Sequence, residues 1–513
     1  MKNQQYIVAL DQGTTSSRCI IYDQELNIVS TAQKELQIFY PQPGWVEQRP
    51  LDIWVTQYGV LTEALLTGNV RPEQVAGIGI TNQRETTLVW DRHTGEPVCN
   101  AIVWQCRRTA DFCRELARRE GDYIREHTGL LCDPYFTASK LHWILHHIEG
   151  TMERAREGAL LFGTVDTYLI WKLTGGRVHA TDYTNASRTM LYDIHKRCWD
   201  QRLLRLLEIP ESMLPEVRPS SGDFGMADLM GTPVPIAGVA GDQQAALFGQ
   251  CGFSAGALKA TYGTGCFALL HSGDRPAADP GGLLVTLGAS AKGAPCYCLE
   301  GSVFIGGAVV QWLRDELGLI NEAQDSAYFA AKVPDSAGVV VVPAFTGLGA
   351  PYWDSGARGA VFGLTRGTTA NHLIRACLES IAYQTADVLG AMEQAAGLKI
   401  RRLLVDGGAT ANPLLMQFQS DIAQAEVRRP MISETTALGA AFLAGLQTGF
   451  WQSEAALRER FRAGQVWQPQ CPAEEARRLM ARWHRAVAAA RAYRETEWKQ
   501  NRPEILFRPV FLE

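Results

Sequence analysis

Short apolar runs recur along the chain, and several of them end at a turn rich in glycine, threonine or serine. Residues 6–10 form the first such run, which ends at Asp11 and returns after the turn as residues 19–23. Residues 257–269 repeat the pattern of strand, Gly/Thr turn and strand, and residues 402–406 run into a glycine loop. Apolar runs bounded by such turns are typical of β-strands. The pattern predicts a β-hairpin in each half of the chain and a third strand followed by a glycine loop.

Strand-like segments alternate with segments of helical pattern, which favours α/β domains. The run at 234–241 leads directly into a predicted helix at 242–248. A helix is also predicted to begin at Pro413, because Asn412 is a good N-cap and proline suits the first helical turn. The other predicted elements are strands at 77–81 and 87–90, helices at 109–120, 137–147 and 437–445, and helical structure in the last sixty residues.

At 513 residues the chain is too long for one compact core, so two large domains are expected. The glycine-rich stretch after residue 249 suggests a boundary near 250, with one domain at 1–250 and the other at 251–513. The longest apolar runs, such as 338–343, are far too short to span a membrane.

Composition and charge restrict the location and the partners of the protein. A net charge of −5 without a basic tract gives no reason to expect a nucleic-acid partner. The first residues lack the long apolar stretch of a signal peptide. The twelve cysteines have no C-x-x-C spacing and are expected to be reduced thiols. These features together predict a cytoplasmic protein.

The first hairpin combines groups that suit a cation and an anion. The backbone N–H groups and hydroxyls of the turn after Asp11 can hold an anion, and the carboxylate can hold a divalent cation. Asp11 read alone is equally well explained as a turn former. Three such turns in a two-domain α/β chain point instead to a nucleotide clamped between domains.

Four segments resemble the signature segments of the FGGY carbohydrate kinases; they are residues 11–18, 241–244, 262–265 and 406–408. The resemblance extends over about residues 5–450 and implies the actin/Hsp70/hexokinase fold, in which two RNase H-like (actin-like ATPase) domains flank a central cleft. Further segments resemble the family members that phosphorylate glycerol; they are residues 79–87, 103–105, 133–136 and 349–354. The implied activity is transfer of a phosphoryl group from ATP to glycerol, giving sn-glycerol 3-phosphate in glycerol catabolism.

The resemblance also implies the residues of the glycerol site. A small triol has little apolar surface, so its affinity must come from hydrogen bonds, and charged partners make the stronger ones. Asp242 is implied to take the proton of the reacting hydroxyl as general base; read alone, it would be explained as a helix N-cap. The implied glycerol-binding residues are Arg84, Glu85, Trp104, Tyr135, Asp242, Gln243 and Phe267.

The nucleotide side is implied in the same way. Asp11 would help to hold Mg²⁺, and the turn after it would contact the terminal phosphates of ATP. Positioning and charge stabilisation should dominate catalysis, because the transferring phosphoryl group is nearly metaphosphate-like. The implied nucleotide-binding residues are Thr14, Thr15, Ser16, Arg18, Thr264, Gly307, Gln311, Gly408 and Asn412.

The chain departs from the family pattern in two places. Cys106 stands where family members usually have aspartate, which should alter local hydrogen bonding without abolishing activity. Residues 224–233 contain neither the basic glycine-rich loop for fructose bisphosphate nor the phosphorylatable histidine of other members, so neither form of regulation is expected. A homo-oligomer, either a dimer or a tetramer, is expected.

Two other functions stay open at this point. One is an FGGY kinase of another polyol or of a ketose, although sugar kinases such as xylulokinases tend to carry Met-His near the positions of Arg84 and Glu85. The other is an ATPase similar to actin or Hsp70 that acts through conformational change, which should lack a polyol pocket and an acceptor base.

Overall fold

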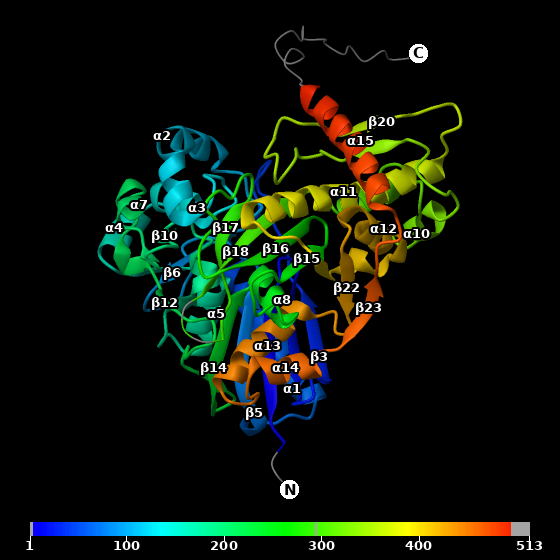
Figure 1. Cartoon of the computed structure of the whole chain (residues 1–513). Helices are drawn as coiled ribbons and strands as arrows, with labels where there is room; N and C mark the ends of the chain where they lie inside the picture. Colours follow the sequence, from blue (N-terminus) through cyan, green and yellow to red (C-terminus); the bar gives the residue numbers. More distant parts are fainter. Residues whose placement is uncertain (1–3, 292, 294, 494–513) are drawn as a thin grey trace, which may run out of the picture.

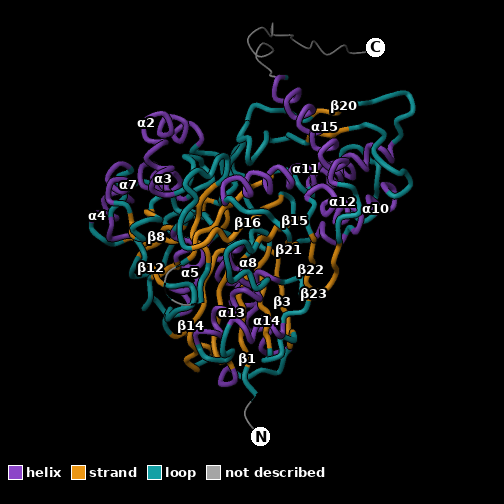
Figure 2. The backbone as a smooth tube through the Cα atoms, viewed as in Figure 1, coloured by secondary structure: helices purple, strands orange, loops and turns teal. Residues whose placement is uncertain are grey.

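The computed structural model describes residues 4–291, 293 and 295–493. Two α/β halves are each built on a mixed β-sheet, as the alternating pattern predicted (Figures 1 and 2). The first sheet has the order β13-β14-β5-β1-β2-β3 and the second has the order β17-β18-β16-β15-β21-β22-β23. None of the helices among the described residues has the length and apolar character that crossing a membrane requires.

The strands of the first sheet are β1 (Tyr6–Gln12), β2 (Ser16–Tyr22), β3 (Ile28–Glu35), β5 (Val75–Asn82), β13 (Met226–Leu229) and β14 (Thr232–Gly241). The other elements of this half are β4 (Glu47–Gln48), α1 (Pro50–Thr67), the 3-10 turn η1 (Pro72–Gln74), β6 (Leu88–Asp91), β7 (Ala101–Ile102), α2 (Ala110–Thr128), α3 (Thr137–His147), α4 (Thr151–Arg156), β8 (Leu160–Gly163), α5 (Val165–Leu173), β9 (Ala180–Asp182), α6 (Tyr183–Ala186), β10 (Tyr192–Asp193), β11 (Cys198–Trp199), α7 (Gln201–Leu206), η2 (Glu211–Met213), β12 (Glu216–Arg218) and α8 (Asp242–Gly249).

The strands of the second sheet are β15 (Leu258–Tyr262), β16 (Cys266–Gly273), β17 (Leu284–Gly288), β18 (Cys296–Val303), β21 (Arg402–Asp406), β22 (Glu426–Pro430) and β23 (Ala463–Trp467). The other elements of this half are α9 (Ala308–Asp315), α10 (Asp325–Ala330), β19 (Val340–Val342), β20 (Ala360–Phe362), α11 (Ala370–Ala396), η3 (Gly408–Ala411), α12 (Pro413–Ala423), α13 (Thr435–Gln447), α14 (Glu454–Arg460) and α15 (Ala473–Ala492).

The two sheets share one arrangement of five strands. In the first, β3, β2 and β1 are antiparallel neighbours, and β5 and β14 continue parallel to β1. In the second, β18, β16 and β15 are antiparallel neighbours, and β21 and β22 continue parallel to β15. The two glycine-rich hairpins therefore occupy equivalent places in the two halves.

The register of the parallel strands determines where their ends lie. Gln12 at the end of β1 pairs with Asn82 at the end of β5, and Gly241 at the end of β14 pairs with the same Asn82. The three segments that follow these strands therefore leave the sheet at one edge, where ligands of α/β proteins commonly bind. They are the turn after β1, the Arg84 segment and the start of α8.

Helix α13 returns to the first sheet, although it comes late in the chain. It packs against α8, β5, β14 and β1, and in Figure 1 the orange α13 lies beside the blue and green strands of the first half. Its buried side chains share an apolar cluster with residues of β1 and β2. The position of the domain boundary along the chain stays a prediction.

One part of the helical prediction for the last sixty residues is wrong. Helices α14 and α15 are present, but β23 lies between them and pairs antiparallel with β22 at the edge of the second sheet. Val466 and Trp467 favour a strand, and the edge of β22 supplies hydrogen-bond partners that the local sequence does not reveal. Residues 494–513 lie outside the described part of the chain.

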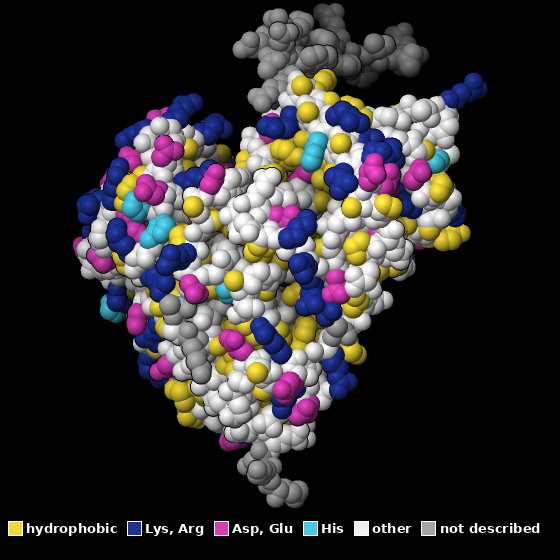
Figure 3. All heavy atoms as spheres, viewed as in Figure 1, with side chains coloured by type: hydrophobic (Ala, Val, Ile, Leu, Met, Phe, Trp, Pro, Cys, Tyr) yellow, Lys and Arg dark blue, Asp and Glu magenta, His cyan; other side chains and the backbone are white. Residues whose placement is uncertain are grey.

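The surface shown in Figure 3 carries basic and acidic side chains interspersed with one another.

The segment 224–233 forms β13, a turn and the start of β14, with Met230 and Gly231 at positive φ in the turn.

Candidate active site

Two charged side chains, each following one of the parallel strands β5 and β14, meet at the same edge of the first sheet. Arg84 follows β5, and Asp242 is the first residue of α8 after β14. The Nε atom of Arg84 lies 3.0 Å from Oδ1 of Asp242. Asp242 stays one-third exposed, whereas Arg84 is buried. Gly241 holds the N-cap position, so the N-cap interpretation of Asp242 is wrong.

Arg84 is held by partners from both halves of the molecule. Its Nη1 donates to Oε1 of Gln244 at 3.2 Å and to Oε2 of Glu300 at 2.6 Å, and its Nη2 donates to Oε1 of Glu300 at 3.1 Å. Burial disfavours the charged form, yet the carboxylates of Glu300 and Glu85 raise the pKa of Arg84 above its usual range. The Arg84 guanidinium is therefore a fixed, buried positive charge in the candidate site.

Glu85 belongs to the same buried ion cluster. Its Oε1 accepts from Nε of Arg188 at 2.5 Å, and Nη2 of Arg188 donates to Glu300 at 2.9 Å. Burial raises the pKa of Glu85, although Arg188 and Arg84 act against that shift. Glu85 has φ of 61°, a left-handed conformation that is uncommon for a residue other than glycine. Backbone strain of this kind is concentrated at functional sites.

Arg188 and Glu300 are members of the cluster that the sequence interpretation missed. Both are fully buried. Burial raises the pKa of Glu300, but Arg188 and Arg84 outweigh it and lower that pKa to about 2. A signal did exist, because Glu300 is a lone carboxylate within the apolar strand Cys296–Val303, and a buried charge requires a partner.

Three aromatic side chains form a wall beside these charges. The ring of Trp104 lies 5.6 Å from that of Tyr135 and 6.4 Å from that of Phe267, both in edge-on geometry. The indole Nε1 of Trp104 donates to the Thr14 hydroxyl at 2.9 Å. One side chain thus connects the aromatic wall to the turn of the first hairpin.

Hydrogen bonds brace the turn of the first hairpin. Gly13 donates to the Ser16 carbonyl at 2.9 Å, and Gln48 donates to the Thr14 carbonyl at 2.6 Å. The Thr15 side chain remains exposed to solvent. Arg18 forms an ion pair with Glu434 and hydrogen bonds with Gln33, so its guanidinium is engaged away from the turn.

Asp11 has the character of a cation ligand. Burial raises its pKa to about 6; Arg18 acts against this shift, and the nearby Asp242 adds to it. Its carboxylate accepts no hydrogen bond from the residues that the structure describes. A half-buried carboxylate near a second one, with open ligand positions, matches the oxygen ligands that Mg²⁺ takes.

In the second half, the start of α9 lies against the turn of the second hairpin, between β15 and β16. Gly307 donates to the Gly263 carbonyl at 2.8 Å, and Ala308 donates to the Thr264 carbonyl at 3.0 Å. These bonds place the first turn of α9, and with it Gln311, beside the second Gly/Thr turn. The Thr264 and Gln311 side chains are exposed.

The third glycine loop and helix α12 after it complete the segments that were predicted to bind the nucleotide. A Cβ at Gly408 would meet no atom within 4 Å, so the backbone there is open to a ligand. Asn412 has a structural role, because its Oδ1 accepts from the backbone N–H groups of Leu414 and Leu415 at 3.1 Å each. The predicted N-cap of the helix at Pro413 is confirmed.

Cys106 is buried in the apolar cluster against which Trp104 and Tyr135 pack. Nε of Arg108 lies 3.1 Å from its Sγ, and Arg108 also pairs with Glu47 at 2.5 Å. The Arg108 guanidinium stacks over the ring of Trp45 at 3.7 Å. The thiol therefore takes part in local hydrogen bonding, through an arginine.

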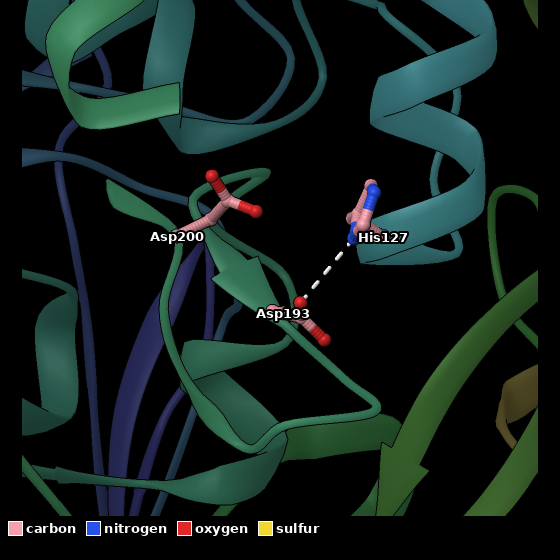
Figure 4. A group of neighbouring side chains, drawn as sticks. All are labelled: His127, Asp193 and Asp200. Carbon is pink, nitrogen blue, oxygen red and sulfur yellow. Dashed lines mark hydrogen bonds and ion pairs between the residues drawn. The ribbon is translucent and has the colours of Figure 1, made fainter. Parts of the chain in front are cut away.

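Another group of possible metal ligands lies outside the site. His127, Asp193 and Asp200 have ligand atoms within 4.8 Å of one another (Figure 4). Asp193 pairs with His127 at 3.3 Å and with Lys196 at 3.1 Å, and Asp200 accepts from the Tyr123 hydroxyl at 2.9 Å. These bonds stabilise the carboxylates without a metal.

Comparisons with known proteins agree with the arrangement of the two halves. Residues 6–249 match the N-terminal domain of the FGGY family of carbohydrate kinases, and residues 258–448 match its C-terminal domain. The chain is 60% identical over 500 residues to glycerol kinase 2 of Pseudomonas aeruginosa, which covers 96% of this chain and 99% of the relative. It is 58% identical over 497 residues to the glycerol kinase of Clostridium beijerinckii, covering 96% and 100%.

A solved structure supports the same assignment. The crystal structure of Plasmodium falciparum glycerol kinase with ADP has a TM-score of 0.90 and 34% identity, and covers 95% of this chain and 98% of that one. The two-domain fold and the family that the motifs predicted are confirmed, and the chain belongs to the FGGY family of carbohydrate kinases.

Proposed function

We propose that this protein transfers the terminal phosphoryl group of ATP to a primary hydroxyl of glycerol, giving sn-glycerol 3-phosphate and ADP. The observation that carries the proposal is the position of the Asp242 carboxylate, one-third exposed and 3.0 Å from Arg84, at the sheet edge that also holds the Asp11 turn. Relatives from Pseudomonas aeruginosa, Clostridium beijerinckii and Vibrio parahaemolyticus with 57–60% identity are named glycerol kinases, and the solved relative was crystallised with ADP.

The substrate would be held by complementary charges. Arg84 supplies N–H donors and Glu85 supplies a carboxylate acceptor, and the rings of Trp104, Tyr135 and Phe267 would enclose the carbon skeleton. Hydrogen bonds to charged groups are the stronger ones, which suits a triol with little apolar surface. Methionine and histidine in place of Arg84 and Glu85 would not supply this pair of charges.

In the reaction, the hydroxyl oxygen of glycerol forms a bond to the terminal phosphorus of ATP while the bond to the ADP oxygen breaks. The hydroxyl proton passes to the Asp242 carboxylate as general base. Thr14, Thr15 and Ser16 would orient the phosphates, and Arg18 would join them by exchanging its partners Gln33 and Glu434 for a phosphate oxygen. Asp11 would hold Mg²⁺, which neutralises charge on the phosphate oxygens when bound.

The nucleotide would lie along the second half. Thr264, Gly307 and Gln311 belong to the second hairpin and the first turn of α9, while Gly408 and Asn412 belong to the third loop. Closure of the two halves would exclude water, which otherwise competes with glycerol as acceptor. The cytoplasmic location, the homo-oligomer and the lack of fructose bisphosphate or phosphohistidine regulation stay predictions.

The proposal is tested by a coupled assay of ADP release with ATP and Mg²⁺, without a polyol and with a panel of glycerol, other polyols and ketoses. We expect release to depend on the acceptor and to be most efficient with glycerol. Most efficient turnover of a ketose or another polyol would contradict the substrate assignment. Release independent of any acceptor would favour an ATPase that acts through conformational change.

A further inference from the structure

Lys259 is a buried lysine at the boundary between the two halves. It lies on β15 of the second sheet, and its side chain is fully buried. Its Nζ donates to Oε1 of Gln243 and, at 2.8 Å, to the Thr261 hydroxyl. Lysine is almost never fully buried unless it is paired. Because Gln243 lies in the first turn of α8, the bond joins the second sheet to the candidate glycerol site.

The bond to Lys259 determines how the Gln243 amide is oriented. An ammonium group has three donors and no acceptor, so it must face the oxygen of an amide. The NH₂ group of Gln243 then points the other way. No hydrogen bond among the described residues uses that NH₂ group.

Nearby carboxylates partly offset the cost of burying Lys259. Burial lowers the pKa of Lys259, whereas the carboxylates of Asp406 and Asp242 act in the opposite sense. The neighbouring Thr261 hydroxyl is a second acceptor for the amine. The amine therefore donates to two acceptors, the Gln243 amide oxygen and the Thr261 hydroxyl. Turning the Gln243 amide would remove one of these two hydrogen bonds.

We propose that Lys259 is a positioning residue that holds the Gln243 amide with its NH₂ group toward the polyol, so that this position of the site donates to a substrate hydroxyl. The inference rests on the proposed function and adds to it. Asp242 and Glu85 are acceptors, and the oriented amide is a neutral donor beside them. The substrate class that fits is a compound with an oxygen acceptor next to the reacting hydroxyl, such as a vicinal polyol.

The test compares steady-state kinetics of the wild type, Lys259→Met, Gln243→Ala and the double variant. Methionine has nearly the length of lysine but has no N–H donor. We expect the glycerol KM to rise about tenfold or more in each single variant, since one oriented hydrogen bond is lost. The ATP KM should change less than about twofold, and the double variant should be no worse than Gln243→Ala.

Other results would overturn the inference. Equal increases in both KM values, a loss of kcat with unchanged glycerol KM, or additive effects in the double variant would show that Lys259 does not act through Gln243. A wild type that fails to use glycerol would instead count against the proposed function, so the two failures are distinguishable.

A second variant covers the case in which Lys259→Met does not fold. Gln243→Glu keeps an acceptor for Lys259 but removes the NH₂ donor. We expect its thermal midpoint to match the wild type and its glycerol KM to rise about tenfold or more. A glycerol KM equal to that of the wild type would overturn the inference.

Discussion

Arg84 shows how a single residue can be both structural and available to a substrate. A guanidinium has five N–H donors, and three of those of Arg84 are used by Gln244 and Glu300. Its Nε lies 3.0 Å from Oδ1 of Asp242 in an ion pair, and one N–H of Nη2 is not used by a hydrogen bond among the described residues. The donors that hold the side chain in place thus differ from the one that remains for a hydroxyl.

Asp242 is the residue on which the proposed chemistry depends most. Asp242→Asn keeps the size of the side chain but removes the group that accepts the proton. We expect kcat to fall by about 10²–10⁴-fold, the usual contribution of a general base, with ATP binding retained. Steady-state turnover and calorimetric nucleotide binding measure the two quantities.

The matched control is Asp223→Asn, at an exposed carboxylate in the loop before β13, which should turn over as the wild type does. Near-normal glycerol phosphorylation by Asp242→Asn would remove Asp242 from the role of base. Loss of nucleotide binding together with turnover would indicate a folding or phosphate-side defect instead.

At the scale of elements, the packing of α13 against α8 positions the start of α8. Gly439 of α13 lies so close to α8 that an added Cβ would overlap the carbonyl group of Ala245. Gly249 at the end of α8 has the same relation to the Thr435 carbonyl. Only glycine allows the backbones to approach this closely, and α8 begins with Asp242 and Gln243.

Gly439→Ala should therefore force the two helices apart. We expect a loss of stability of about 1–3 kcal/mol or more, as in overpacked cores, together with a lower kcat because the start of α8 shifts. Urea unfolding and the coupled assay measure the two effects. Gly390→Ala is the control, because a Cβ there would meet no atom within 4 Å; in a helix this change should be neutral or stabilising.

If Gly439→Ala and Gly390→Ala had the same free energy of unfolding and the same kcat, the close approach of α8 and α13 would not be needed for stability or turnover.

Helix α15 is attached to α11 through one carboxylate. Asp387 accepts from Trp483 Nε1 at 2.6 Å and from the Tyr352 hydroxyl at 2.8 Å, and it pairs with His484 at 2.7 Å. The Trp483 ring also stacks on Tyr383 with centroids 5.4 Å apart. The hydrogen bond to Asp387 raises the pKa of His484 above its ordinary value of 6.5.

This shift makes the attachment of α15 dependent on pH. A raised pKa in the folded state contributes stability that is present below pH 6.5 and is lost as the pH rises through the folded value. We expect the stability difference between the wild type and His484→Gln to be larger at pH 6 than at pH 9. It should stay below about 1 kcal/mol, because the ring is half exposed.

Urea unfolding at the two pH values measures this difference. His93→Gln, at an exposed histidine in the turn after β6, is the control and should show no such dependence on pH. An equal difference at pH 6 and pH 9 for His484→Gln would rule out the charged pair.

At the scale of the whole molecule, the buried ion cluster joins the two halves. Glu300 comes from β18 of the second sheet, and Arg84 and Arg188 come from the first half. Charges this deeply buried are stable only while all partners are present. The site that would bind glycerol is therefore built on a bond between domains.

Glu300→Gln should be strongly destabilising, because two buried guanidiniums lose their shared carboxylate. We expect a loss of about 3–5 kcal/mol in urea unfolding, the usual result of breaking a buried pair, and a raised glycerol KM through Arg84. Glu475→Gln on α15, at a partly exposed residue that pairs with Arg478, is the control and should leave both quantities unchanged. A small effect of Glu300→Gln would mean that the halves do not depend on this cluster.

The local elements could largely be predicted from the sequence. The first hairpin, the helix at 137–147 and the step from β14 into α8 follow from apolar runs, turn residues and capping residues close together in the chain. The strand β23 could not be predicted in this way, because its partner β22 lies more than thirty residues away. The interpretation of Asp242 as an N-cap failed because the preceding glycine holds that position.

The sequence by itself determined the α/β class, the Gly/Thr turns proposed to bind phosphate, the family and the side chains proposed to meet glycerol. These properties depend on residue type and on short spacings, which a sequence displays directly. Only the tertiary structure decided that Glu300 and Arg188 support Arg84 and Glu85, that Lys259 orients Gln243, and that α13 packs on the first sheet. The reason is that the burial of a charge and the choice of its partner depend on which distant strands end at the same place. The register of the strands in the two sheets determines where those strands end.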